Sequence, residues 1–397
     1  MPKIKSFPQK PISIFKVRSF LKKTEAKLKK EQKFRGLDTL MGVPLPEAIY
    51  TWRKLLPYNP NNLGNWSING IKPCHQTAFI EQEVIQQMIS LYHGDQKKIE
   101  GYVSSGGTEA NLFSAWIGRK FLESKGIKRE KIVLIKTSLT HYSLEKATDV
   151  IGVKALVTPL NEQSWGMDPE FFEKSIKKLI KKGYKGFLVP LTFGYTLTGT
   201  IDPFPEICQL TRELKKEFKD VDFFLWLDAA LNGLIEPFLN KSFCPFNYPE
   251  IQTFLTDFHK FGFVPIPAGL ILYRKDLRKL IEKPIDYLNE KDNTLLGSRS
   301  GIVPVACWSV VNRLGKIGFQ KMILKSIRKK EVFIKRIKLI NGLEVITNKK
   351  SLNLALIKEK NDLEIKKIES EYGLLFRRIN LQFTRQKMSK LIAKAFF

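Results

Sequence analysis

The sequence predicts an α/β fold, a mostly parallel sheet covered by helices, followed by a small α+β unit. Between about Phe79 and about Tyr273, helical stretches alternate with short apolar runs that are typical of buried strands, and this alternation indicates a parallel sheet. After about Leu280 the pattern changes to a long basic helix and then to strands. The sequence contains no internal repeat and no low-complexity linker, so we expect the two units to pack together.

The individual elements follow from the same periodicities. We expect strands in the first unit at 132–136, 155–158, 186–190, 223–228, 253–256 and 270–273. We expect helices between them at 109–122, 144–151, 169–181 and 205–217. In the second unit we expect a helix at 322–340, strands at 343–347, 352–358 and 374–383, and a helix that closes the chain.

These changes of pattern divide the chain into three parts. Residues 1–64 form a basic arm and helix, 65–280 a large α/β domain, and 281–397 a small α+β domain.

The charge of the chain is strongly positive. There are 67 Lys and Arg against 39 Asp and Glu, a formal net charge of +28. Such a charge attracts nucleic acid, anionic membrane surfaces, or phosphorylated and carboxylate ligands. In the arm, Ile14, Val17, Leu21 and Leu28 share one face of a helix. We expect this helix to be solvated and to pack on a neighbouring subunit, with membrane or nucleic-acid attachment as the less favoured alternative.

The cellular setting follows from the cysteines and the hydropathy. The four cysteines lie far apart with no C-x-x-C pair, which argues against a disulfide framework and a thiolate metal site and favours a reducing compartment. No apolar run approaches the roughly 18 residues that span a bilayer, and the first residues lack the apolar region of a secretory signal. We therefore expect a soluble cytoplasmic protein.

Polar residues of the types that bind ligands or take part in reactions lie at the ends of the expected strands, where open α/β sheets bind their ligands. The segment Ser104–Asn111 is a Gly turn that opens a helix, and its N–H groups and hydroxyls are suited to a phosphate. Asp228 ends an apolar strand, and the small residues Ala229 and Ala230 after it leave room for a flat ligand. A carboxylate in this setting needs a cationic partner.

Three further segments contribute to the same edge. Lys260 precedes the apolar run 261–267, and an amine in apolar surroundings tends to be neutral and nucleophilic, as a Schiff-base lysine must be. His141 follows the first expected strand, although a lone histidine there is more often structural. Residues 194–202 form a loop bounded by glycines.

Together these residues form the parts of a pyridoxal 5'-phosphate site. A lysine binds the cofactor, an acid faces the pyridinium nitrogen, a ring stacks on the cofactor, and a Gly/Ser/Thr turn holds its phosphate. Neither a metal site nor a dinucleotide site uses all of these residues, so we expect no metal.

At these residues the chain resembles the group II pyridoxal phosphate-dependent decarboxylases. Residues 105–111, SGGTEAN, 228–230, DAA, and 259–260, HK, look like motifs of that family. The segment 259–269 is most similar to archaeal-type tyrosine/aspartate decarboxylases, and bacterial histidine decarboxylases share much of the pattern. Sphingosine phosphate lyase, a relative with the same fold, has stretches similar to 297–301 and 306–308.

The resemblance implies an aspartate aminotransferase-like fold, fold type I, with a seven-stranded sheet. It assigns Lys260 to the Schiff base and Asp228 to the pyridine nitrogen, and it places His141 on one ring face and Ala230 on the other. The phosphate would be held by Ser105, Gly106, Gly107 and His259. Gly194-Tyr195-Thr196 stands where the family usually has Gly-Thr-Thr, so Thr196 keeps one hydroxyl near the cofactor and a phenol replaces the other.

The resemblance also implies a homodimer with shared active sites. Gly297 and Ser298 match a turn that completes the phosphate site of the second subunit, and Tyr287 matches a mobile-loop tyrosine that could protonate the substrate carbon. Trp226 and Phe258 depart from the residues common at their positions, and we expect neither to touch the chemistry.

The implied function is decarboxylation of an L-amino acid of the tyrosine, aspartate or histidine class to the amine and carbon dioxide. Two alternatives remain open. One is an aldol-type carbon-carbon lyase that acts on a phosphorylated amino alcohol. The other is a non-catalytic relative that binds nucleic acid through the basic surface.

Overall fold

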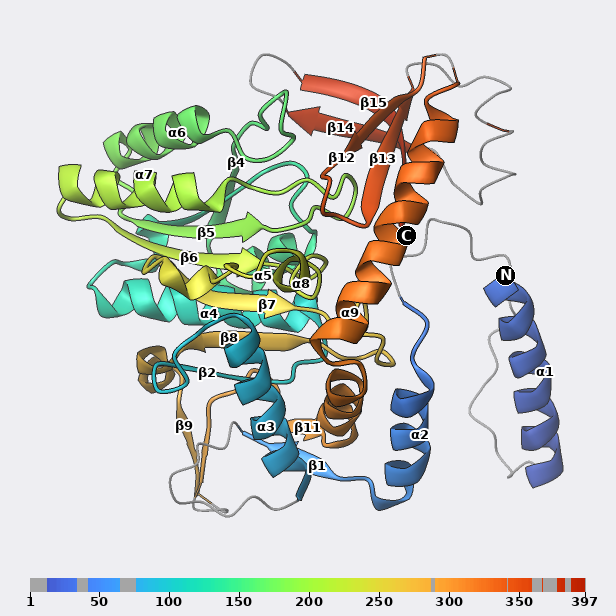
Figure 1. Ribbon diagram of the computed structural model, residues 1–397. Coiled ribbons are helices and arrows are strands. Elements are labelled where there is room, and N and C mark those ends of the chain that lie inside the picture. Colours follow the sequence, from blue (N-terminus) through green and yellow to red (C-terminus); the bar gives the residue numbers. More distant parts are fainter. Residues whose placement is uncertain are drawn as a thin grey trace.

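The centre of the protein is a seven-stranded sheet (Figure 1). The computed structural model describes residues 13–33, 42–64, 76–286, 290–340, 342–358, 366, 377–382 and 387–396. The strand order is β2-β8-β7-β6-β5-β3-β4, and the pairs β7·β6, β6·β5, β5·β3 and β3·β4 are parallel. The strands are β2 (Ile99–Tyr102), β3 (Ile132–Lys136), β4 (Lys154–Val157), β5 (Gly186–Thr192), β6 (Asp222–Asp228), β7 (Ile251–Thr256) and β8 (Leu270–Arg274). The mostly parallel α/β sheet predicted from the sequence is confirmed.

Helices cover both faces of this sheet because its strands are apolar on both faces. In β5, Phe187 and Val189 enter one core together with α6 and α7, and Leu188 enters a second core together with α4 and α5. The helices of the large domain are α3 (Gln76–Leu91), α4 (Gly107–Ser124), α5 (Ser143–Ile151), α6 (Pro169–Lys181), α7 (Phe204–Glu217) and α8 (Glu236–Leu239). Short 3-10 helices are η1 (Leu56–Tyr58), η2 (Arg129–Lys131), η3 (Pro245–Asn247) and η4 (Lys275–Leu280).

Local signals explain why the helices begin and end where they do. Asp168 precedes α6 and accepts a hydrogen bond from the Phe171 N–H at 3.0 Å, while Pro169 occupies the first turn, where a missing N–H costs nothing. The helix α5 ends at Gly152, whose φ of 66° is the left-handed conformation that terminates helices.

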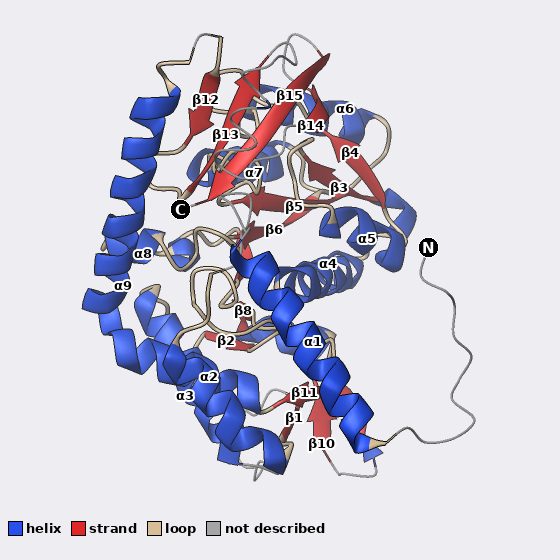
Figure 2. Cartoon of the chain, turned by 90° about the vertical axis from the view of Figure 1, so that its right-hand side faces the viewer, coloured by secondary structure: helices blue, strands red, loops and turns tan. Residues whose placement is uncertain are grey.

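The C-terminal part contains a long helix and a second sheet. The helix α9 (Ile302–Ile337) starts well before the expected residue 322 and bends at Gly315, whose φ is 55°. An antiparallel sheet follows in the order β12-β13-β15-β14, and Figure 2 shows it beside the large sheet. Its strands are β12 (Glu344–Thr347), β13 (Asn353–Lys358), β14 (Arg377–Gln382) and β15 (Lys387–Phe396).

The expected closing helix is wrong, because residues 387–396 form the strand β15. Its sequence contains three Lys, two Ala, one Met and one Leu, which favour helices, but β15 pairs with β13 from Asn353↔Phe396 to Lys358↔Leu391. Ile392, Ala393 and Ala395 are buried in this pairing. Tertiary pairing therefore overrides local propensity here.

The sequence patterns also missed several short strands. The strand β2 at the sheet edge has only four residues, and β1 (Asn61–Leu63), β9 (Lys283–Ile285), β10 (Glu290–Asp292) and β11 (Ser298–Ser300) have three each. Such segments are too short to show a period of two. The antiparallel pair β1·β11 joins two segments far apart in the sequence.

Two helices precede the large domain. The helix α2 (Pro46–Leu55) packs on α9 (Figure 1). The expected amphipathic helix of the basic arm is α1 (Ile14–Lys33), which stands apart from the body of the chain in Figure 1. Its Phe15 and Phe20 side chains are 75% and 68% exposed. Its packing on another subunit stays a prediction. None of the described helices has the length and apolar character to cross a membrane.

Candidate active site

The loops after four parallel strands surround a cavity of about 260 Å³. Asp228 is the last residue of β6, Lys260 follows β7, His141 follows β3, and Thr196 follows β5. All four residues line the cavity, together with the Gly turn at the start of α4. The structure therefore brings together the residues that the sequence predicted at this edge of the sheet.

The Gly turn is fixed in a conformation that only glycine adopts easily. Gly106 has a φ of 146°, and a Cβ on it would lie 2.9 Å from His259 Cε1. Glu109 accepts a hydrogen bond from the Ser105 N–H at 2.6 Å and from the Tyr102 hydroxyl at 3.0 Å. The first N–H groups of α4 have no partner within the helix, and Gly107 places them at the cavity wall, which makes this end of the helix suitable for an anion.

Asp228 is buried and held by two hydrogen bonds. Asn111 Nδ2 donates to its Oδ2 at 2.7 Å, and the Ala230 N–H donates to its Oδ1 at 3.2 Å. The indole Nε1 of Trp226 donates to Asn111 Oδ1 at 2.9 Å, which fixes the orientation of that amide. Trp226 therefore acts on Asp228 only through Asn111, and it does not itself line the cavity.

His141 is oriented by Ser143, which follows it by two residues. The Ser143 N–H donates to His141 Nδ1 at 3.2 Å, so the ring carries its proton on Nε2, and Ser143 Oγ lies 2.8 Å from the same nitrogen. Burial, with the nearby Lys260 charge, lowers the pKa of His141 below its ordinary value, although Asp228 and Asp257 act in the opposite direction. The imidazole is therefore neutral at pH 7.

Lys260 lies in more polar surroundings than its sequence neighbours suggest. Its Nζ is 2.9 Å from Asp257 Oδ2, and Asp257 is 2% exposed. The expected apolar environment of the amine is wrong, because the side chains of Phe261 and Val264 turn into the core while Lys260 faces the cavity. Asp257 is thus a site residue that sequence reasoning did not single out, and its place three residues before the lysine was the available signal.

The Asp257 carboxylate lies beneath the Gly turn. Its Oδ2 would be 3.2 Å from a Cβ on Gly107, and its Oδ1 has no hydrogen-bond partner among the described residues. His259 Nε2 is 3.6 Å from the same carboxylate, and His259 Nδ1 accepts a hydrogen bond from the Ala268 N–H at 3.3 Å. The loop around Lys260 is therefore fixed from both ends.

The phenol of Tyr195 points away from the cavity. Tyr195 is fully buried, and its hydroxyl lies 2.8 Å from Thr137 Oγ1 and 2.7 Å from Asp202 Oδ1. Burial raises the pKa of Asp202 to about 6. Thr196, the next residue, does line the cavity. The departure from the family motif at Tyr195 thus changes the support of the loop.

Two predicted site residues that the structure describes, Gly297 and Ser298, do not line the cavity. Gly297 and Ser298 are exposed, and Ser298 Oγ instead accepts a hydrogen bond from Asn61 Nδ2 at 3.2 Å in the pair β1·β11. The next residue, Arg299, is buried in an ion pair with Glu81. Tyr287 lies outside the described residues.

The donor set of the cavity fits pyridoxal phosphate. It combines an amine, a buried carboxylate that accepts two N–H hydrogen bonds, a neutral imidazole, and a helix N-terminus lined by glycines whose Cβ atoms would fill the space. Across the parts of the chain that the structure describes, no group of three or more His, Cys, Asp or Glu side chains is placed to hold a metal ion.

Comparisons with known proteins agree with this chemistry. Residues 71–357 match the profile of the family described as "Pyridoxal-dependent decarboxylase conserved domain". The chain is 29% identical over 308 residues to a tryptophan decarboxylase of Clostridium sporogenes, covering 76% of this chain and 72% of that protein. It is 31% identical over 270 residues to a probable L-tyrosine/L-aspartate decarboxylase of Methanococcus maripaludis, covering 66% of each, slightly under two thirds of that relative's length.

A solved structure shares the fold over nearly the whole chain. The L-methionine decarboxylase of Streptomyces sp. 590 has a TM-score of 0.81 at 17% identity, covering 98% of this chain and 93% of that chain. The architecture expected for fold type I is thereby confirmed.

Proposed function

The chain belongs to the pyridoxal-dependent decarboxylase family, and from this premise we propose that Lys260, Asp228 and His141 remove the α-carboxylate of an L-amino acid as carbon dioxide. The protein is an enzyme, a carboxy-lyase whose cofactor is pyridoxal 5'-phosphate. One observation carries the assignment of residues. The amine, the carboxylate, the imidazole and the start of α4 all line one cavity of about 260 Å³.

When bound, pyridoxal phosphate supplies an electron sink for the electron pair that the departing carboxylate leaves behind. Lys260 lines the cavity, and its Nζ would hold the cofactor there. Asp228, whose carboxylate accepts hydrogen bonds from Asn111 and Ala230, would face the ring nitrogen and pair with its proton. Buried charge without such donors would be costly.

The other residues orient the ring and hold the phosphate. His141, a neutral imidazole, would stack on one face of the ring, and the small side chain of Ala230 would leave room on the other face. Ser105, Gly106 and Gly107 would hold the phosphate at the N-terminus of α4, with His259 beside them.

We place aromatic substrates first among the tyrosine, aspartate and histidine classes, with tryptophan added because a relative bears that name. At the cavity mouth, Tyr142 and Ile266 are 59% and 60% exposed, and Leu139 lies beside them. Of the described residues that line the cavity, Lys260 is the one Lys or Arg, and its role commits it to the cofactor. A substrate with an acidic side chain, such as aspartate, would need a second cationic residue in the cavity to pair with that side chain.

Three further expectations are kept as proposals. The subunits form a homodimer in which exposed Gly297 and Ser298 complete the phosphate site of the second subunit, and Tyr287 supplies a proton to the substrate carbon. The chain divides at residues 64 and 280. The protein works in the cytoplasm. We do not propose the alternative of an aldol-type lyase acting on a phosphorylated amino alcohol, because the family that the chain belongs to is described by decarboxylation.

The test is release of carbon dioxide from L-tyrosine, L-tryptophan, L-histidine and L-aspartate by holoenzyme. We expect turnover of an aromatic amino acid, its loss in Lys260→Ala, and wild-type turnover in the exposed control Lys241→Ala. Turnover that survives Lys260→Ala would remove that residue from the mechanism. A preference for aspartate would overturn the proposed substrate class.

A further inference from the structure

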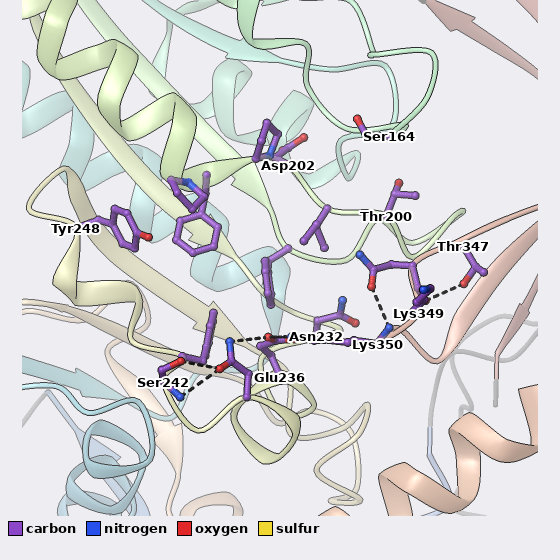
Figure 3. A pocket seen from close by; sticks show the side chains of 18 of the residues that line it. Ser164, Thr200, Asp202, Asn232, Glu236, Ser242, Tyr248, Thr347, Lys349 and Lys350 are labelled. Atoms are coloured by element: carbon purple, nitrogen blue, oxygen red, sulfur yellow. Dashed lines mark hydrogen bonds and ion pairs between the residues drawn. The ribbon is translucent and has the colours of Figure 1, made fainter.

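A second and larger cavity, of about 950 Å³, lies between the large domain and the turn that joins β12 to β13 (Figure 3). It has a polar wall and an aromatic wall. The polar wall consists of Asn232, Glu236 and Lys350, which lie close together in Figure 3. The aromatic wall consists of Phe204, Phe243 and Tyr248. None of the proposed catalytic residues lines this cavity, so it is separate from the active site.

The polar wall presents a carboxylate and an ammonium side by side. Lys350 Nζ lies 2.6 Å from Glu236 Oε1, which also accepts a hydrogen bond from Asn240 Nδ2 at 3.1 Å. No described residue donates to Glu236 Oε2, although Glu236 is only 7% exposed. One carboxylate oxygen is thus still able to accept hydrogen bonds at the wall of the cavity.

Asn232 is a buried amide whose side-chain oxygen has no partner. The residue is 4% exposed, and its Oδ1 forms no hydrogen bond with the residues that the structure describes. An unsatisfied buried polar group costs about 1–3 kcal/mol, so such a group at a cavity wall points to a ligand that satisfies it. Asn232 can donate to or accept from that ligand.

The aromatic wall is rigid and apolar. Phe243 stacks on Phe193 with ring centroids 5.1 Å apart, and Phe204 meets Tyr248 edge-on at 5.1 Å. Phe204 and Phe243 are 9% and 5% exposed. These rings offer a preformed surface for the apolar part of a small molecule.

We propose that this cavity binds a zwitterionic amino acid with an apolar side chain, at a site separate from the catalytic one. Lys350 pairs with the ligand carboxylate, Glu236 Oε2 and Asn232 bind its ammonium group, and the aromatic wall packs against its side chain. An inorganic anion would face the Glu236 carboxylate, and a simple amine would face the ammonium group of Lys350. A zwitterion satisfies both charges.

The test is calorimetric titration of holoenzyme that has been reduced with borohydride, so that no turnover occurs. We expect saturable binding of L-phenylalanine, with 2-phenylethylamine and 3-phenylpropionate at least about 10-fold weaker. Glu236→Gln should weaken L-phenylalanine binding by at least about 10-fold, because an amide keeps the hydrogen bonds of the wall and removes its negative charge. Lys350→Gln should weaken L-phenylalanine but not 2-phenylethylamine.

The control is Glu130→Gln, the same change at an exposed residue of η2, which should bind as the wild type does. Lys350 is exposed, so its variant keeps the test valid even if Glu236→Gln fails to fold. Absence of saturable L-phenylalanine binding would overturn the proposal. Binding that neither Glu236→Gln nor Lys350→Gln changes would also overturn it, because the ligand would then lie in the catalytic cavity. Equally tight binding of 3-phenylpropionate would overturn it too, because the site would then recognise only a carboxylate.

Discussion

At the scale of single residues, Asp228 and His141 are held in place by hydrogen bonds from neighbours that carry no charge. Asn111 belongs to the SGGTEAN segment and was interpreted from the sequence only as part of a phosphate turn. In the structure its amide joins Trp226 to Asp228, residues more than 110 positions away. The sequence predicted the types of residue at the site, but a contact at that separation is created by the fold and no local pattern contains it.

The first prediction concerns Asp228. Asp228→Asn keeps the shape of the side chain but removes the charge that holds a proton on the ring nitrogen. We expect turnover to fall by about 100-fold or more, the range for losing a preorganised electrostatic contact. Steady-state carbon dioxide release measures this. The control Asp222→Asn, at the other end of β6, should keep wild-type turnover. Equal rates for the two variants would remove Asp228 from the mechanism.

The second prediction concerns the pH dependence of His141. Burial lowers its pKa below the ordinary 6.5, so the ring gains a proton only as the pH falls below that value. A charged imidazole would repel the cationic cofactor ring, and we expect cofactor affinity to drop there. Absorbance titrations from about pH 5 to about pH 8 should show this drop in the wild type and a smaller one in His141→Phe. Identical profiles would contradict a neutral stacking role.

At the scale of elements, the strands of the large sheet could be predicted and the pieces at its margins could not. β5 and β6 are apolar runs buried on both faces, which is a strong signal. β15 has a sequence that suits a helix, and its partner β13 decides the outcome. The sequence did not predict where the phenol of Tyr195 points either, because its direction depends on hydrogen bonds with Thr137 and Asp202.

The third prediction concerns the junction between α9 and the small sheet. Lys330 is 2% exposed, and its Nζ donates to the Asn348 carbonyl at 2.8 Å and to the Ser351 carbonyl. Burial lowers its pKa to about 8, so it still carries its charge at pH 7. Lys330→Met leaves these acceptors unsatisfied, and we expect it to lower the free energy of unfolding by about 1–3 kcal/mol. In thermal melts, Lys330→Met should unfold at a lower temperature than the exposed control Lys329→Met. Equal melting temperatures would show that Lys330 does not stabilise this junction.

At the scale of the whole molecule, two features point beyond one chain. The apolar side chains of α1 are exposed, and Gly297 and Ser298 lie outside the cavity of their own chain. A homodimer would account for both features, because the second subunit would cover the apolar side chains of α1 and would bring its own Gly297 and Ser298 to the phosphate site. Sequence motifs suggested this arrangement through resemblance alone, because contacts between subunits leave no local pattern in a chain.

The fourth prediction tests this sharing of sites. Lys260→Ala lacks the amine, and Ser298→Asp should repel the phosphate. In a hybrid dimer, one of the two sites combines an intact Lys260 with an intact Ser298 of the other subunit. We expect co-expression of the two inactive variants to restore roughly a quarter of wild-type activity. Activity no higher than that of the separate variants would show that each site is built from one chain.

The central claim is that Lys260 holds the cofactor at the edge of the large sheet. The most direct measurement is an absorbance spectrum with added pyridoxal phosphate, then borohydride reduction and mass mapping of the adduct. We predict a cofactor band that borohydride abolishes and a single reduced adduct on Lys260. An adduct on another lysine, or no band and no adduct, would contradict the account.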